Sequence, residues 1–251
     1  MTVRRILAAA VLATVATVSF AAKKDEDRVA DLEARVAALE KSLADIDARL
    51  QARVDAAIQD LAQREQRADE ALREITNLYN QGKHLEARGA LDAFNAKYAG
   101  TEAAKRAARM GEELNVVGKP APAEFAVEKW YVPGDPVDLS APGTTLLVFF
   151  EEWCPHCKRE VPKLKETYAR MKAEGLHVVA LTKLTRGATD EKVQAMIQEG
   201  GLDFPIAKET GALSEYFNIS GIPAAAVVKD GRVIWRGHPA NLSDAVLKGM
   251  L

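Results

Sequence analysis

The residues of this chain best suited to chemistry are its two cysteines. Cys154 and Cys157 are the only cysteines among 251 residues, and Pro155 and His156 separate them. Two thiols at this spacing can form and break a disulfide reversibly.

A zinc site would need two further ligands, but there is no second cysteine pair and the other histidines are scattered. Covalent haem attachment would need a histidine where Lys158 stands. The pair therefore indicates redox exchange without a metal or cofactor, with a weakly stabilising structural disulfide as the alternative.

The surrounding pattern predicts where the pair lies. The apolar run 145–150 has the length and composition of a strand. A helix should follow, because apolar residues recur at spacings of three and four: Val161, Leu164, Tyr168 and Met171. The cysteines then occupy a helix N-terminus, where unpaired N–H groups favour an anion. We expect a stabilised thiolate at Cys154, helped by His156 when protonated. Cys154 would attack a substrate sulfur, and Cys157, one turn further, would resolve the mixed disulfide.

Further elements are predicted on both sides of this motif. Before it, short strands are expected around Trp130 and over 137–139. After it, a strand over 177–181 would complete a β-α-β unit with parallel pairing. A helix capped by Thr189, a hairpin turning at Asp230 and a terminal helix should follow. The stretch 185–189 is predicted to be a loop, with no chemistry assigned to it.

The N-terminal residues resemble an export signal. Two arginines precede an uncharged stretch over residues 6–20, and small residues follow it. The stretch is short for a membrane span, which needs about 20 residues. We therefore expect residues 1–22 to be a cleaved signal peptide, with an uncleaved inner-membrane anchor over 6–20 as the alternative. Either would place the thiols outside the cytosol, and the expected compartment is a bacterial periplasm.

Residues 23–80 are predicted to form a coiled coil. Residues 1–81 contain neither glycine nor proline, and all ten prolines occur from Pro120 onward. Apolar residues alternate at spacings of three and four: Leu32, Val36, Leu39, Leu43, Ile46 and Leu50. After a stutter at 50–58 the heptads resume in a new frame with Leu61, Ala68, Leu72 and Ile75. A homo-oligomeric stalk is expected, dimer or trimer; the alternative is a helix folded back on its own domain.

A helical hairpin or connector is expected over residues 81–117. Gly82 interrupts the long helix, and Gly100 with Thr101 should end one short helix and begin the next. A proline-rich linker beginning at Gly118 leads into the last domain, 118–251. The formal net charge is −2, which implies no nucleic-acid partner.

Residues 118–251 resemble the thioredoxin superfamily. Trp153-Cys-Pro-His-Cys-Lys158 follows an apolar strand, and Pro162 matches the proline of the active-site helix in that family. The segment 219–237 is similar to the thioredoxin segment that carries a cis-proline and then a hairpin. The lead-in 118–125 and the segment 201–205 resemble the TlpA/ResA type of thiol–disulfide proteins. The resemblance implies a thioredoxin-like α/β fold, a mixed sheet flanked by helices, preceded here by the coiled coil and the helical hairpin.

The same resemblance implies roles for three more residues. The Ile222–Pro223 bond would be cis and lie beside Cys154, leaving the backbone of Ile222 free to pair with an extended substrate. Trp153 would form an apolar wall next to the sulfurs; plain core packing is its alternative. Cytosolic thioredoxins carry a buried aspartate where Val148 stands, so the proton transfer that this acid assists must be done otherwise here. Glu152 is a candidate, although a surface charge is the favoured interpretation.

The expected function is an exported thiol–disulfide oxidoreductase acting on client proteins with cysteines. A reductase supplied by a separate redox partner is the first expectation. The dipeptide Pro155-His156, however, resembles the oxidising DsbA type, so an oligomeric oxidase or isomerase is an alternative. An envelope coiled-coil scaffold with a thioredoxin-like binding module is another.

Overall fold

The computed structural model describes residues 3–122, 124–134 and 137–251, with side chains from residue 23 onward. The chain divides into two compact units, Met1–Gln63 and Arg64–Leu251, each described separately below. The predicted signal peptide or anchor falls on residues 1–22, whose side chains lie outside the described part. Of the helices formed by described residues, none is long and apolar enough to cross a membrane.

The first unit is helical throughout its described part and belongs to α1 (Val3–Asn80). Large apolar side chains along it are 43–68% exposed: Val29, Leu32, Val36, Leu39, Leu43, Ile46, Leu50, Val54, Ile58 and Leu61. They follow the spacing that predicts a coiled coil. The uninterrupted helix agrees with the absence of glycine and proline before Gly82.

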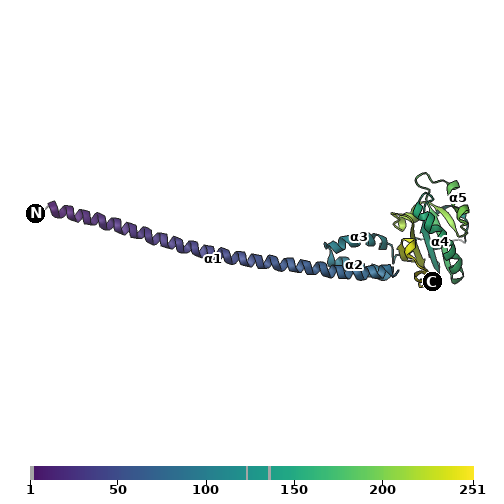
Figure 1. The fold of residues 1–251 in the computed structure, drawn as a ribbon, viewed down its shortest axis with the longest axis horizontal. Helices are drawn as coiled ribbons and strands as arrows, with labels where there is room; N and C mark the ends of the chain where they lie inside the picture. Colours follow the sequence, from purple (N-terminus) through teal and green to yellow (C-terminus); the bar gives the residue numbers. More distant parts are fainter. Residues whose placement is uncertain (1–2, 123, 135–136) are drawn as a thin grey trace. The chain divides into compact units, whose positions relative to one another are not determined.

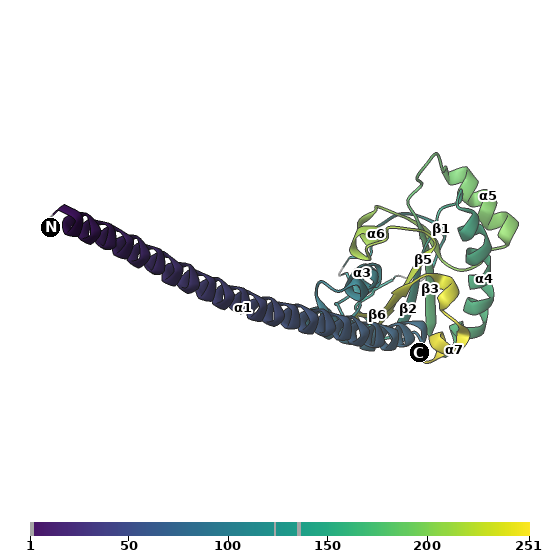
Figure 2. The same ribbon diagram turned by 60° about the vertical axis from the view of Figure 1, so that its left-hand side comes forward.

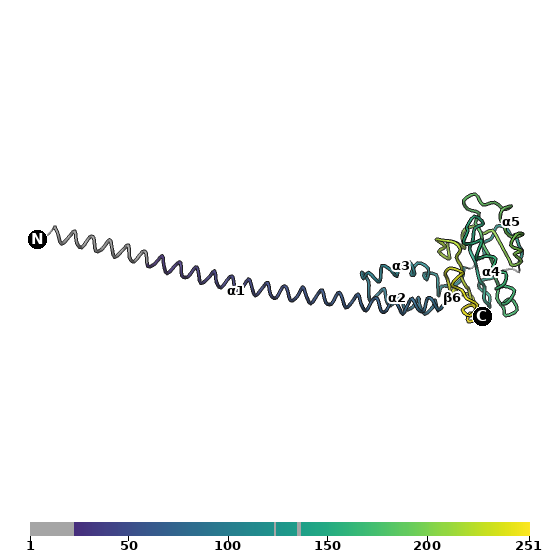
Figure 3. The backbone as a smooth tube through the Cα atoms, in the orientation of Figure 1, coloured from purple at the N-terminus to yellow at the C-terminus, as the bar shows by residue number. Residues whose placement is uncertain are grey.

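The second unit begins with a three-helix arrangement. The last turns of α1 pack against α2 (His84–Tyr98) and α3 (Glu102–Leu114), as the trace in Figure 3 shows. The hydroxyl of Thr101 accepts the N–H of Ala104 and caps α3, as predicted. Apolar side chains from the three helices share one cluster: Ala68, Ile75, Ala87, Leu91, Phe94, Ala103, Ala107 and Leu114. The helical hairpin is confirmed, and it buries Ala68 and Ile75, which the heptad pattern had allotted to the stalk.

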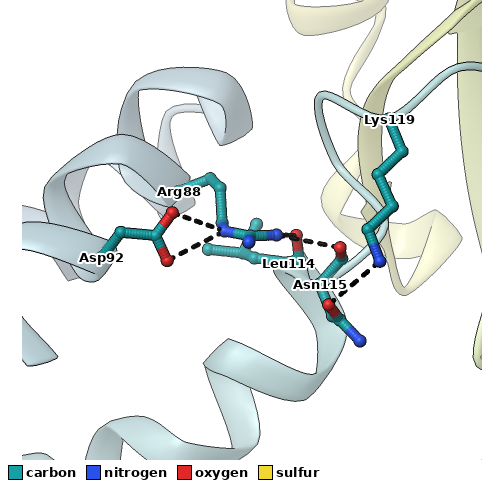
Figure 4. Close-up of polar contacts among 5 residues, drawn as sticks. All are labelled: Arg88, Asp92, Leu114, Asn115 and Lys119. Carbon is teal, nitrogen blue, oxygen red and sulfur yellow. Dashed lines mark hydrogen bonds and ion pairs between the residues drawn. The ribbon is translucent and has the colours of Figure 1, made fainter.

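Arg88 joins the two helices of the hairpin (Figure 4). Its Nε contacts both carboxylate oxygens of Asp92 at 3.0 and 3.1 Å. Its Nη1 donates to the carbonyls of Leu114 and Asn115, each at 2.9 Å. Lys119 extends the contact by donating to Asn115 Oδ1 at 3.2 Å. Carbonyls at a helix C-terminus have no partner within the helix, so the guanidinium satisfies groups that α3 leaves free.

A six-stranded mixed sheet follows (Figure 1). Its strands are β1 (Val127–Val132), β2 (Thr144–Phe149), β3 (Leu176–Thr182), β4 (Ile206–Glu209), β5 (Ala224–Lys229) and β6 (Arg232–Gly237). Their spatial order is β1-β4-β3-β2-β5-β6. β2 pairs with β3 and β3 with β4 in parallel, and the other neighbours are antiparallel. The parallel β2–β3 pair confirms the predicted β-α-β unit.

Helices cover both faces of this sheet, as Figure 2 shows for α4 and α6. One face packs against α4 (Pro155–Met171), α5 (Asp190–Gly200) and α7 (Asp244–Lys248), and the other against α6 (Ala212–Tyr216). Short 3-10 turns lie at Lys172–Glu174 and Pro239–Asn241. Alternate residues of β2 point to opposite faces, Leu146 and Val148 to one and Leu147 and Phe149 to the other. The predicted mixed sheet flanked by helices is thus confirmed.

One local expectation needs correction, and one strand was not expected. Val137–Leu139 forms no strand; Asp138 Oδ1 instead accepts the backbone N–H of Ser140 at 2.8 Å, which makes a turn. The four-residue strand β4 was not predicted, because so short a segment carries too little periodicity to be recognised.

The helical hairpin docks on the sheet through His84. The imidazole is 2% exposed and is stacked between Tyr79, at 4.4 Å, and Trp235 of β6, at 5.0 Å between ring centroids. Its Nδ1 accepts the N–H of Arg236 at 3.3 Å, and its Nε2 lies 3.2 Å from the carbonyl of Tyr79. A neutral imidazole with its proton on Nε2 satisfies both contacts. Burial lowers the pKa of His84 to about 4, in keeping with this neutral form.

Candidate redox site

The cysteine pair lies where a fully buried strand meets a helix. Every residue of β2 is buried, and the strand ends at Phe149. Cys154 is the N-cap of α4 and Pro155 is its first residue, a position that suits proline because its missing N–H would be unpaired anyway. The predicted strand-to-helix placement is therefore what the structure contains.

Cys154 is surrounded by backbone groups. Its sulfur accepts the N–H of Cys157 at 3.3 Å and lies 3.7 Å from the carbonyl of Ile222. The residue is 4% exposed. An N–H directed at the sulfur from the first turn of a helix would stabilise negative charge there.

Cys157 lies deeper than Cys154. It is 0% exposed and belongs to the apolar cluster that includes Val161 and Leu164 of the same helix. Burial is the main cause that raises the pKa of the Cys157 thiol far above its ordinary value, and the hydrogen bond with Cys154 adds to it. Both cysteines are free thiols in the structure. Both residues are buried, but Cys154 keeps a small exposed fraction and Cys157 has none, and burial favours the protonated form of the Cys157 thiol.

The segment that precedes β5 completes one side of the site. The Ile222–Pro223 bond is cis, as the resemblance implies. Cys154, Trp153, His156 and Ile222 line one cavity of about 530 Å³. The structure therefore brings four of the six predicted site residues to one cavity, with Cys157 behind Cys154.

Pro223 lines a second cavity of about 360 Å³. Ser220, Gly221 and Ile222 line both cavities. The far wall of the second one includes Arg109, Glu112 and Glu113 of α3. Sequence reasoning did not anticipate that the helical hairpin reaches the cis-proline segment, because that contact depends on how the hairpin docks.

His156 is exposed and has a cationic neighbour. Arg159 Nη2 lies 2.6 Å from His156 Nδ1. A guanidinium can only donate, so this contact requires an unprotonated Nδ1. The role of His156 in stabilising the Cys154 thiolate stays a prediction.

Trp153 is held against the loop after β3. Its indole Nε1 donates to Thr185 Oγ1 at 3.3 Å, and Arg186 stacks on its ring with the guanidinium carbon 4.4 Å from the centroid. The ring is half-buried and also packs against the core. It serves both the wall and the core packing that were set out as alternatives.

Glu151 is the acidic residue that sequence reasoning missed. Its carboxylate accepts hydrogen bonds from Thr182 Oγ1 at 3.1 Å, Lys183 N at 3.1 Å and Thr185 N at 3.2 Å. Its own carbonyl accepts the N–H of Cys154 at 3.1 Å. The residue is 3% exposed. A hydrogen bond to its backbone lowers the pKa of the Cys157 thiol, and its negative charge raises that pKa to a smaller extent. The sequence does show two adjacent acids between the apolar strand and the cysteines. Their spacing alone could not tell which of the two would be the buried hydrogen-bond acceptor.

Glu152 is not the surface charge that was favoured. It is 8% exposed, and Lys192 Nζ lies 4.0 Å from its Oε1. It does not line the cavity beside Cys154.

Known proteins resemble part of this chain. ResA of Bacillus thuringiensis (strain Al Hakam), a thiol-disulfide oxidoreductase, is 30% identical over 99 residues, which are 39% of this chain and 55% of that protein. Sporulation thiol-disulfide oxidoreductase A of Bacillus subtilis is 25% identical over 111 residues, 43% of this chain and 66% of that protein. The chain thus spans about half the length of the ResA protein, and somewhat more of the sporulation protein. A solved thiol-disulfide isomerase from Corynebacterium glutamicum aligns with a TM-score of 0.43 at 21% identity, covering 51% of this chain and 92% of that one.

The family assignment rests on the matched segment together with the fold and the cysteine site. Residues 116–251 match the Redoxin family. That segment contains the whole mixed sheet, both cysteines and the cis-proline. The chain belongs to the Redoxin family and is a thioredoxin-superfamily protein of the TlpA/ResA-like type.

Proposed function

We propose that this chain is a thiol–disulfide oxidoreductase in which Cys154 attacks and Cys157 resolves. The observation that carries the proposal is the inequality of the two sulfurs. The Cys154 sulfur receives a helix N-terminal N–H at 3.3 Å and borders a cavity, whereas Cys157 is 0% exposed. The relatives' names as thiol-disulfide oxidoreductases support the same activity.

The proposed reaction is a two-step exchange. The Cys154 thiolate attacks one sulfur of a client disulfide, forms a mixed disulfide and releases the other client sulfur as a thiolate, which takes up a proton. The Cys157 thiol then loses its proton and attacks the Cys154 sulfur. A Cys154–Cys157 disulfide forms and the second client sulfur leaves. Two electrons pass from the chain to the client, and a dithiol partner must restore them.

Geometry supports an extended client segment as the substrate. Ile222 offers a backbone carbonyl beside the Cys154 sulfur, at 3.7 Å, and Trp153 and Ile222 both line the cavity there. An extended peptide can pair with such a backbone edge while its cysteine reaches Cys154. Pro223 has no backbone N–H, so the part of this backbone that can pair with the peptide would end there.

The direction of electron flow is tested by the reduction potential of the pair. A purified chain lacking residues 1–22 would be equilibrated with glutathione buffers, and the disulfide fraction measured. We propose a reductase, with a potential near the roughly −270 mV of thioredoxin; a value near the roughly −120 mV of DsbA would indicate the alternative, an oxidase or isomerase. A pair that forms no reversible disulfide would contradict any redox function.

Substitution of each cysteine tests the roles. Cys154→Ala should abolish turnover of a protein disulfide, because no attacking thiolate remains. Cys157→Ala should accumulate mixed disulfides with clients, visible as higher-mass species that disappear under reducing conditions. A fully active Cys154→Ala chain would exclude the proposed reaction.

The exposed apolar stripe of α1 favours a second candidate, an oligomeric oxidase or isomerase. Leu32 to Leu61 repeat at coiled-coil spacing and are exposed in the single chain. A coiled coil over the exposed part of this stripe would gather several Cys154 sites on one assembly, which suits isomerisation. We further propose export by residues 1–22 to an oxidising compartment such as a periplasm, with residues 81–117 as connector and 118–251 as the redox domain.

A further inference from the structure

The loop between β3 and α5 has a shape that the proposed exchange reaction does not explain. Leu184 and Arg186 adopt left-handed backbone conformations, with φ of 62° and 53°, although neither is glycine. Such conformations cost free energy and persist only where the surroundings hold them. This loop overlaps residues 185–189, which the sequence pattern predicts to be a loop with no assigned chemistry.

The surroundings that hold the loop are part of the cysteine site. The buried carboxylate of Glu151 accepts hydrogen bonds from Thr182, Lys183 and Thr185. Thr185 in turn accepts the indole N–H of Trp153 at 3.3 Å. Glu151 and Trp153 both come from the turn that leads to Cys154, so the loop and the reactive sulfur are fixed by the same few residues.

The result of this arrangement is a cation held at the mouth of the cavity. Arg186 stacks on Trp153, with its guanidinium carbon 4.4 Å from the ring centroid, and both residues line the cavity with Cys154. Lys183 lines it as well. Both cations are exposed, and among the described residues neither forms an ion pair with a carboxylate.

The carboxylates of the same cavity lie deeper. Glu151 and Glu209 are 3% and 2% exposed, and their oxygens accept hydrogen bonds from the loop and from Ser214. The first turn of α4 contains no acidic residue, and Lys158 and Arg159 are exposed there. An approaching side chain therefore meets cations before it meets the buried carboxylates.

We propose that Arg186, held over Trp153 by the loop that Glu151 anchors, selects client segments that carry carboxylates beside the reactive cysteine. Lys183 strengthens the same preference. A planar guanidinium fixed over an aromatic ring retains its N–H edge for a carboxylate. This inference rests on the proposed thiol–disulfide exchange and names the substrate class of that site: an extended, acidic, cysteine-containing peptide.

The test compares three short peptides that differ only in charge. Each carries one cysteine as its mixed disulfide with mercaptoethanol, flanked on both sides by Glu, Gln or Lys. The reduced full chain is mixed with each peptide, and the rate of disulfide loss is followed in a single turnover after acid quenching. Mercaptoethanol disulfide alone, which is uncharged, serves as a fourth substrate.

We expect the Glu peptide to react about three- to tenfold faster than the Lys peptide at low salt, with the Gln peptide between them. The preference should shrink as salt rises from about 0.01 M to about 1 M, because the screening length falls from about 30 Å to about 3 Å. Arg186→Gln should lower the Glu-to-Lys rate ratio severalfold. Arg186→Lys should retain part of the ratio, since it keeps the charge but not the planar fork.

Arg170→Gln is the matched control. It removes the same charge from α4, 14 residues after His156, which is about 21 Å along a helix. The control should keep the wild-type ratio. Equal rates for the Glu and Lys peptides in the wild-type chain, or an unchanged ratio in Arg186→Gln, would overturn the proposed specificity. Failure of the wild-type chain to reduce any of the four substrates would instead overturn the exchange reaction itself.

Discussion

The backbone N–H of Cys157 donates a hydrogen bond to the sulfur of Cys154 across 3.3 Å. The residue whose thiol is buried thus stabilises, through its main chain, the sulfur that borders the cavity. The two sulfurs lie one helical turn apart. That of Cys154 is suited to attack a client disulfide, and that of Cys157 is suited to the later step that resolves the mixed disulfide.

The first prediction concerns the pH dependence of resolution. Burial raises the pKa of the Cys157 thiol, so its thiolate fraction is small and should grow about tenfold for each pH unit below that pKa. The rate at which Cys157 releases a small thiol from a mixed disulfide on Cys154 should therefore rise steadily with pH. Stopped-flow measurement of that release tests it, with Cys157→Ala as the control that should show no release. A rate that is flat across neutral pH would contradict the prediction.

The second prediction concerns the anchored loop. Glu151→Gln removes the charge and one of the two oxygens that receive three hydrogen bonds, so it should lower the free energy of unfolding by about 1–3 kcal/mol. Urea denaturation measures this loss, and the fluorescence of Trp153 should change with the loop it contacts. Glu152→Gln is the matched control, because among the described residues Glu152 makes only a long contact, with Lys192 Nζ at 4.0 Å, and its loss should cost less. Equal losses in the two variants would argue against the anchoring role.

The third prediction concerns acid stability through His84. Burial lowers its pKa to about 4 in the folded chain, whereas an unfolded histidine titrates near 6.5. Between these values the unfolded state binds the extra proton, so stability should fall as pH drops from about 6.5 to about 4, by about 3 kcal/mol in all. Below that range the folded histidine is also protonated and the loss should level off.

His84→Phe isolates this effect. The aromatic ring keeps the stack between Tyr79 and Trp235 but cannot titrate. Unfolding free energies of both chains measured across the acidic range should differ in slope, with the shallower slope in the variant. Parallel curves would show that the loss at low pH comes from other groups.

The fourth prediction concerns the apolar stripe of α1. Leu39 and Ile46 are 68% and 57% exposed and lie seven residues apart on the predicted seam. Replacing both with Glu should dissociate the proposed oligomer, since charges at seam positions cannot be buried against a partner helix. Sedimentation velocity measures the change in mass.

Lys41→Glu with Ala48→Glu provides the control for that experiment. These positions have the same seven-residue separation but lie off the seam, so the oligomer should persist. A wild-type chain that sediments as a monomer at all concentrations would contradict the coiled coil.

Much of the redox domain follows from local patterns. The strand before Cys154, the helix after it and the hairpin at Asp230 each carry their own periodicity or turn signal, and all are present in the structure. Hydrophobic spacing determines such elements because each must bury one face, whatever its neighbours are. The placement of Cys154 at a helix N-terminus, and hence its proposed reactivity, depended on these signals alone.

Tertiary packing decided what lies across from each element. Glu151, and not Glu152, accepts hydrogen bonds from the loop after β3. This choice depends on where the loop places its N–H groups. The burial of Ala68 and Ile75 depends on the hairpin that folds back onto α1, and the stacking of His84 depends on Trp235, 151 residues further along the chain. Periodicity describes only the face that an element must bury; the partner that buries it is set by contacts between residues far apart in sequence, which no local pattern records.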